Sequence, residues 1–246
     1  MEAKNPNRHP VNPNWAQLQQ KLKQSRPSVD SKRTPYRTAL GKRKERPEPE
    51  PEPLPPPFVL TPTSDDCSLT NVIAMDCEMV GVSSQGNKSA LGRVTLVNEW
   101  GNAVYDEYVR PLERVVDFRT EISGIRPKDL WKAKSFWAVQ KKVAELIKGR
   151  ILVGHSLSND FKALLLSHPK KDIRDTSEYQ PFLREGRRRA LRDLAAHILG
   201  VKIQIKEHCS IEDARAAMFI YQKNKKEWER NIKKYIKSKR KLKEHE

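Results

Sequence analysis

The stretch IAMDCEMVGV, residues 73–82, places two carboxylates inside an apolar run. Side chains at i and i+2 of a strand point to the same face, so Asp76 and Glu78 share a face. Two carboxylates on one face repel each other and are costly to remove from water. A divalent cation between them would offset both costs, and oxygen ligands favour Mg²⁺ or Mn²⁺ over zinc. The alternative is a strand end where both acids reach water.

Two later segments share a second pattern, in which a histidine precedes an acidic residue by five positions. Five residues along a helix correspond to about 500°, so each histidine must lie before the helix that its acid begins. The segments are GHSLSNDFKALLL (154–166, with His155 and Asp160) and EHCSIEDARAAMFIY (207–221, with His208 and Asp213).

Structural roles also fit these residues. An acid in the first turn of a helix interacts favourably with the helix dipole, which is the alternative to metal binding for Asp160 and Asp213. Ser210 is expected to cap the second helix, because SIED precedes an apolar helical run. For each histidine the alternative is a hydrogen-bonded residue at a strand end.

The elements that must position these residues are visible in the hydrophobic pattern. Three adjacent strands come first, and strands alternating with helices follow. This order predicts a mixed sheet with an antiparallel half and a βαβ half. Strands are expected at about 71–79, 91–97, 103–109, 150–155 and 172–175, and helices at about 135–148, 159–167, 189–199 and from 211 onward.

Charge and proline divide the 246-residue chain into a body and two basic tails. The net charge of +17 comes mostly from residues 1–57, at +6, and residues 222–246, at +7. Thirteen of the 17 prolines lie within residues 1–62. We expect a disordered tail over 1–62, a globular domain over 70–225 and a basic extension over 226–246. Basic tails of this kind suit a polyanion such as nucleic acid, and solubility alone is the alternative.

Other sequence features limit the compartment and suggest contacts. Three unpaired cysteines indicate neither a zinc module nor a disulfide framework, and they favour a reducing compartment. No apolar run is long enough to span a bilayer, so no membrane association is expected. GKRKER (41–46) is a candidate nuclear import signal. Trp15, Leu18 and Leu22 have helical spacing after Asn14 and suggest a short helix that docks on a protein partner, or a transient helix without one.

Taken in order, the acidic and histidine motifs resemble the DEDDh superfamily of 3′→5′ exonucleases. The segments that carry this resemblance are MDCEMVG, HSLSNDFKAL and HCSIED. Three flanking segments, DFRTEISGIRP, HPKKDIRDTSEYQPF and LAAHILGVKIQ, resemble the RNA exonuclease 4 subgroup, close to the interferon-stimulated RNA exonucleases. The resemblance covers about residues 70–230.

The resemblance implies an RNase H-like exonuclease fold, with a five-stranded mixed sheet flanked by helices. It implies that His208 is the general base and assigns His155 no catalytic role. It places Asp175 outside the metal set, as a structural acid. The implied ligands of two Mg²⁺ or Mn²⁺ ions are Asp76, Glu78, Asp160 and Asp213.

Substrate contacts follow from the same resemblance. Met79 is expected beside the terminal nucleotide, and Arg119 near the terminal ribose, where a donor can distinguish RNA from DNA. A surface ion pair is the alternative for Arg119. REGRRR (184–189) either follows a phosphate backbone or is a solvated loop.

The function predicted from the sequence is a monomeric, metal-dependent 3′→5′ exoribonuclease that releases nucleoside 5′-monophosphates. The family and the basic segments together imply the nucleus, and the nucleolus with a role in ribosomal RNA processing. Two alternatives stay open. The first is a nuclear RNA-binding assembly factor whose catalytic body is secondary, and the second is a DNA 3′→5′ exonuclease.

Overall fold

A mixed β-sheet organises the described part of the chain, which in the computed structural model is residues 60–243, with side chains described to Ser238. The strand order is β5-β3-β2-β1-β6-β7, and β4 pairs with β1. The five expected strands are present, and two short strands, β4 and β5, extend the sheet. The strands are β1 (Val72–Val82), β2 (Lys88–Val97), β3 (Ala103–Arg110), β4 (Val115–Asp117), β5 (Lys134–Ser135), β6 (Ile151–Gly154) and β7 (Ile173–Asp175).

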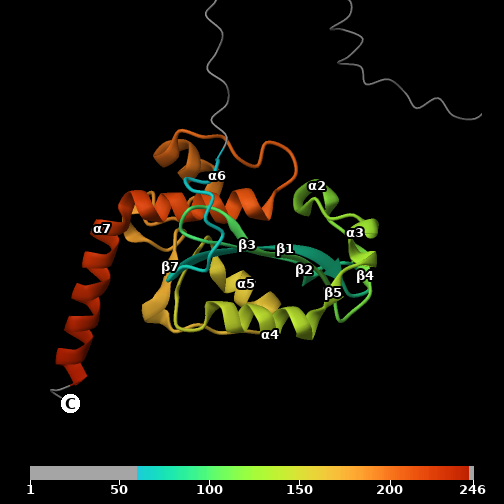
Figure 1. Cartoon of the computed structure of the whole chain (residues 1–246), viewed down its shortest axis with the longest axis horizontal. Helices are drawn as coiled ribbons and strands as arrows, with labels where there is room; N and C mark the ends of the chain where they lie inside the picture. The colour runs from blue at the N-terminus through green and yellow to red at the C-terminus, as the bar shows by residue number, and fades with distance from the viewer. Residues whose placement is uncertain (1–59, 244–246) are drawn as a thin grey trace, which may run out of the picture. The chain divides into compact units, whose positions relative to one another are not determined.

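Helices cover both faces of this sheet, which confirms the expected α/β class. Figure 1 shows α4 and α5 on one side of the sheet and α6 and α7 on the other. The helices are α2 (Thr120–Ser123), α3 (Pro127–Trp131), α4 (Phe136–Ile147), α5 (Leu157–Leu164), α6 (Leu191–Leu194) and α7 (Ser210–Lys243), with 3₁₀ turns at Lys170–Asp172 and Gln180–Phe182 and a π-helical turn at Ala195–Leu199.

The central strand β1 separates two hydrophobic cores. Ile73, Met75 and Cys77 pack into the core that contains buried residues of α4 and α5. Val72 and Ala74 pack into the core that contains buried residues of α7. The two-residue period of the strand therefore directs the even-numbered positions, including those of Asp76 and Glu78, to the α7 side.

Strand β1 has a strand neighbour on only one side along its middle. It pairs with β6 in parallel from Val72 to Ala74, and with β4 from Gly81. Between these two pairings, residues 75–80 of β1 pair with β2 alone among the strands of residues 60–243. Helix α5 begins three residues after β6 ends and contacts β1. The missing strand leaves room for side chains from α5 and α7 to approach the acids of β1.

A β-bulge interrupts the pairing of β1 and β2 beside these acids. Glu78 lies opposite Arg93 and Met79 lies opposite Leu91, so Gly92 is the additional residue on β2. A Cβ atom at Gly92 would lie 2.5 Å from Cδ1 of Ile125, which is fully buried between α2 and α3. Glycine therefore lets the α2–α3 segment pack closely against the bulge. The additional residue also bends β2 at this point.

The last helix, α7, continues through the boundary expected at residue 226. Trp228 is 3% exposed, and its ring stacks on Tyr179 with 3.9 Å between the centroids. Nearby, Glu229 accepts hydrogen bonds of 2.6 and 2.9 Å from the guanidinium of Arg174 on β7. The first turns of the expected extension are thus part of the core. Within residues 60–243 no helix has the length and apolar character to cross a membrane.

The predictions for residues 1–59 lie outside the part of the chain that the structure describes. They include most of the expected 1–62 tail, the segment with Trp15, Leu18 and Leu22, and the GKRKER patch.

The packing of Trp228 generates a stability prediction. Replacing Trp228 with alanine should lower the free energy of unfolding by about 3–5 kcal/mol, because it removes a large buried ring from the core. Urea denaturation followed by circular dichroism measures this change. Lys233→Ala, at an exposed position of the same helix, is the matched control. Equal stability of the two variants would show that residues beyond 226 are not part of the folding unit.

Candidate active site

Four carboxylates from three elements meet beside the open edge of β1. Asp76 and Glu78 lie on β1, Asp160 in the first turn of α5, and Asp213 in the first turn of α7. The pKa of Asp76 is raised well above its usual value, first by burial and then by the charges of Asp213, Asp160 and Glu78. The four acids therefore lie close enough for their charges to act on Asp76, and two of them, Glu78 and Asp213, belong to a group with metal-binding distances.

Burial raises the pKa of each of these acids, and the charges of neighbouring acids add to this effect. Burial and the charge of Asp213 raise the pKa of Glu78 to about 8, against the opposing charge of Arg93. Burial likewise raises the pKa values of Asp160 and Asp213 to about 7. Holding charged carboxylates close together and away from water costs free energy. A bound cation offsets this cost and allows the carboxylates to stay ionised.

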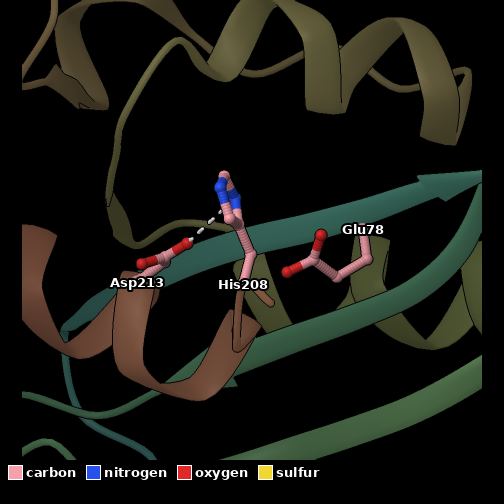
Figure 2. Close-up of side chains that lie close together, drawn as sticks. All are labelled: Glu78, His208 and Asp213. Atoms are coloured by element: carbon pink, nitrogen blue, oxygen red, sulfur yellow. Dashed lines mark ion pairs between the residues drawn. The ribbon is translucent and has the colours of Figure 1, made fainter. Parts of the chain in front are cut away.

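Three of the site residues have the geometry of a metal-binding group. Glu78, His208 and Asp213 each offer one ligand atom, and these atoms all lie within 4.8 Å of one another. Figure 2 shows Glu78 on its strand, Asp213 at the start of α7 and His208 on the segment that precedes this helix. Buried polar oxygens normally have hydrogen-bond partners. Oε1 of Glu78 and Oδ1 of Asp213 are buried and have none among the described residues, so the donor set fits a divalent cation.

His208 is positioned by the chain segment between β4 and α3. Its backbone N–H donates a 2.7 Å hydrogen bond to the carbonyl of Ile122 in α2. The neighbouring Glu207 accepts two hydrogen bonds, of 2.7 and 3.1 Å, from Arg126. Nδ1 of His208 lies 3.7 Å from Oδ2 of Asp213. Burial and the charge of Arg192 lower the pKa of His208, so its imidazole is neutral near pH 7.

Met79 and Arg119 line one pocket of about 600 Å³ with Glu78 and His208. Arg119 adopts a left-handed backbone conformation, with φ of 50°. Its guanidinium donates hydrogen bonds to Oγ of Ser89 at 2.8 Å and to the carbonyl of Gly86 at 2.9 Å. These contacts replace the surface ion pair that was the alternative for Arg119, and they hold its side chain at the wall of the pocket.

The start of α7 is attached to the sheet by a contact that differs from the expected cap. Ser210 is the first residue of the helix, and its hydroxyl hydrogen-bonds Oγ1 of Thr95 on β2 at 2.6 Å. The expectation that Ser210 caps the helix is wrong, because Ser210 lies within the first turn and the backbone N–H of Asp213 donates to the carbonyl of Cys209 at 2.9 Å. Thr95 also donates to Asp106, which pairs with Arg93 at 2.6 Å.

His155 and Asp175 make structural contacts. Nδ1 of His155 hydrogen-bonds the hydroxyl of Thr176 at 2.9 Å. The carboxylate of Asp175 accepts hydrogen bonds from the backbone N–H groups of Ser156 and Leu157, at 2.8 and 2.9 Å. Asp175 thus caps the start of α5, the helix that carries Asp160.

Sequence reasoning missed several residues of the site. Gln204 donates a 2.8 Å hydrogen bond to Oδ2 of Asp213, and Arg93 lies opposite Glu78 on β2. No local pattern distinguishes these residues, since each depends on a contact between separate segments. The pocket lining adds further residues, among them Ser89, Ile122, Asn159 and Lys162.

Comparison with known proteins identifies relatives of this domain. A family model described as Exonuclease (RNase_T) matches residues 73–221. The chain is 54% identical over 167 residues to RNA exonuclease 4 of Xenopus laevis, covering 67% of this chain and 40% of that protein. It is 55% identical over 163 residues to RNA exonuclease 4 of Homo sapiens, covering 65% and 39%. The chain thus spans about 40% of the length of these two relatives.

Solved structures similar to this chain include two of Pan2. The catalytic unit of Neurospora crassa Pan2, with protease and nuclease domains, superposes with a TM-score of 0.59 and 29% identity, over 71% of this chain and 30% of that one. A Saccharomyces cerevisiae Pan2 module in complex with A7 RNA superposes with a TM-score of 0.57 and 33% identity, over 68% and 30%.

The raised carboxyl pKa values generate a prediction for the metal-free protein. The folded state retains protons that the unfolded chain has released, so stability is full below the usual carboxyl pKa and falls as pH rises through the folded values, toward about 8. With chelator present, the thermal midpoint should fall between about pH 7 and about pH 8.5, and it should fall less in Glu78→Gln.

Cation addition completes this test. At the higher pH, Mg²⁺ or Mn²⁺ should raise the midpoint of the native chain more than that of Glu78→Gln, because ligands that bind only the folded state stabilise it. Equal shifts in the two proteins would mean that these acids do not bind the ion.

Proposed function

Because this chain belongs to the exonuclease family, we propose that it is a divalent-metal-dependent 3′→5′ exoribonuclease that releases nucleoside 5′-monophosphates. The observation that carries the proposal is the convergence of four acids and His208 beside the Met79–Arg119 pocket. The family match, residues 73–221, contains all of these positions.

RNA is the proposed substrate class. The relatives that share about half of the aligned residues are named RNA exonuclease 4. A structural neighbour at 33% identity was solved with RNA bound. The pocket supports this choice, since the oriented guanidinium of Arg119 offers donors that can contact a ribose 2′-hydroxyl, the group that distinguishes RNA from DNA.

The four acids are the proposed ligands of two Mg²⁺ or Mn²⁺ ions. Their oxygens are hard donors, and two of the buried oxygens have no hydrogen-bond partner among the described residues. Bound ions of this kind lower the pKa of water and stabilise charge on the attacking and leaving oxygens. Gln204 orients the Asp213 carboxylate, and Asp175 orients the helix that carries Asp160.

His208 is the proposed general base. Its lowered pKa keeps the imidazole neutral near pH 7, the state that can accept a proton from the attacking water. The backbone contact to Ile122 holds the ring at the pocket, and its side chain is 36% exposed, so the accepted proton can pass to solvent.

Met79 and Arg119 are proposed to bind the terminal nucleotide. Met79 follows the metal-binding pair on β1 directly, after the bulge that bends the strand at this point. A pocket of about 600 Å³ beside the acids can accept a single nucleotide, which fits release of one residue at a time.

Nuclear, and specifically nucleolar, residence with a role in ribosomal RNA processing is part of the proposal. It rests on the basic segments of the sequence and on the resemblance of its motifs to the family. Monomeric action and a protein partner for the segment with Trp15, Leu18 and Leu22 are expectations of the same kind. A DNA exonuclease and an RNA-binding assembly factor are the alternatives that activity measurements distinguish.

Loss of Asp76 tests the metal-dependent reaction. Asp76→Ala should abolish nucleotide release, since it removes an acid at the centre of the carboxylate group. The measurement is a time course on matched single-stranded RNA, duplex RNA and DNA, with Mg²⁺, Mn²⁺ or chelator. His155→Ala is the control, because this histidine contacts Thr176 outside the pocket.

The outcomes separate the candidate functions. Native-rate release of mononucleotides by Asp76→Ala would contradict the metal site. Faster digestion of DNA than of RNA would support the DNA exonuclease, and tight RNA binding without release would support the assembly factor.

His208→Ala tests the general base. Release should slow by roughly 10²–10⁴, the usual contribution of general-base catalysis. The acidic limb of the pH–rate profile, which reports protonation of the base, should disappear. An unchanged profile in His208→Ala would identify another group as the base.

A further inference from the structure

A basic hairpin precedes α6 and has no part in the chemistry described above. Arg184 and Arg187 exchange backbone hydrogen bonds of 3.0 and 2.9 Å across a two-residue turn. The turn residues Glu185 and Gly186 both have positive φ, of 53° and 75°. Two-residue turns of this kind impose a defined backbone, so the hairpin presents its arginines from a fixed position.

This segment carries more positive charge than the ion pairs of the domain neutralise. Residues 184–192, here called the arginine segment, contain five arginines and one glutamate. Arg188 pairs with Glu178 at 2.6 Å. The exposed side chains of Arg184 and Arg187 make neither an ion pair nor a hydrogen bond with any other residue between 60 and 238. They therefore contribute positive charge to the surface without an acidic partner in the described domain.

The arginine segment borders a groove of about 760 Å³. Arg184, Arg187, Arg188 and Arg189 contribute to its lining, and so do the acids Glu185 and Asp193. Cations therefore outnumber acids in the groove, which is the charge balance that an anionic chain requires. A guanidinium matches the geometry of phosphate oxygens and can bind two of them at once.

The groove lies near the active site and is separate from the nucleotide pocket. The arginine segment leads into α6, and α6 packs against α7, the helix that begins with Asp213. The charge of Arg192, at the start of α6, acts on His208, and that of Arg188 acts on His155 in the turn before α5. The groove and the nucleotide pocket share no lining residue, so both can be occupied together.

We propose that the arginine segment binds backbone phosphates of single-stranded RNA on the 5′ side of the nucleotide held in the Met79–Arg119 pocket. The inference rests on the proposed function, because an enzyme that removes 3′ nucleotides must hold the remaining chain beside its site. Phosphates recur at every nucleotide, so contacts to them bind any sequence. The acidic surface of a protein is the competing partner for the same charges.

The test compares RNA binding by the full chain and by Arg184→Gln/Arg187→Gln, which leaves the Arg188–Glu178 pair intact. A 5′-fluorescent oligouridylate of about twelve nucleotides is titrated in chelator, which prevents cleavage, over about 50 to 200 mM salt. The slope of log K against log salt should be shallower by about 1.4 in the variant, since each phosphate contact on a single strand contributes about 0.7.

The control is Lys141→Gln/Lys148→Gln, which removes the same charge from exposed positions in and just after α4, on the other side of the sheet (Figure 1). Its slope should match that of the native chain. Circular dichroism and the thermal midpoint establish that all three proteins are folded. Equal slopes for the arginine variant and the lysine control would overturn the proposal and leave an acidic protein surface as the partner of this groove.

A parallel digestion separates this inference from the proposed function. Because the contacts lie upstream, the arginine variant should lose more kcat/KM on a long RNA than on a dinucleotide. If the native chain binds the oligouridylate but releases no nucleotide with Mg²⁺ or Mn²⁺, the proposed function is contradicted. The salt slopes would still show whether the arginine segment binds phosphates. Equal losses on both substrates would contradict an upstream contact.

Discussion

The crowding of four carboxylates, with Glu78, Asp160 and Asp213 buried and Asp76 partly exposed, is the constraint on which this structure depends. Burial raises the pKa of Asp76 most, and the charges of the other three acids add to this effect. Without a cation, these acids repel one another. Contacts elsewhere in the domain must therefore hold together the strand and the two helices that carry them. Because burial and repulsion both raise the energy of these charges, a divalent cation bound among them would stabilise the site.

Contacts from distant segments provide this resistance. Ser210 connects the start of α7 to Thr95 in the sheet, and the backbone of His208 is bonded to Ile122. Asp175 caps α5 and so places Asp160. Each contact positions an element that carries a functional side chain, so the supporting residues need no chemistry of their own. The absence of a strand beside the middle of β1 gives these elements access to the acids.

Two surfaces beside the acids have different characters. The Met79–Arg119 pocket is bounded by a strand bulge and by a guanidinium that hydrogen bonds hold in place. The arginine segment begins with a hairpin whose exposed Arg184 and Arg187 have no ion-pair partner among the described residues, whereas Arg188 pairs with Glu178 and Arg192 with Asp193. A pocket of this kind can select a chain end, while a charged groove can hold a chain of any sequence. Together they suit an enzyme that acts repeatedly on one end of a polymer.

The sequence by itself determined the strands, the acids and the histidine of the site. Strand alternation, a local signal, places Asp76 and Glu78 on one face, and the resemblance of the motifs to a known family pointed to Asp160, Asp213 and His208. Only the tertiary structure decided how the site is supported. Ser210 was expected to cap its own helix, yet its hydroxyl bonds Thr95, and nothing near Gln204 in the chain shows that it would orient Asp213. Such contacts join residues far apart in the chain or on separate segments. A hydroxyl or an amide can hydrogen-bond several alternative partners with similar energy. Which partner it takes depends on how the helices pack against the sheet.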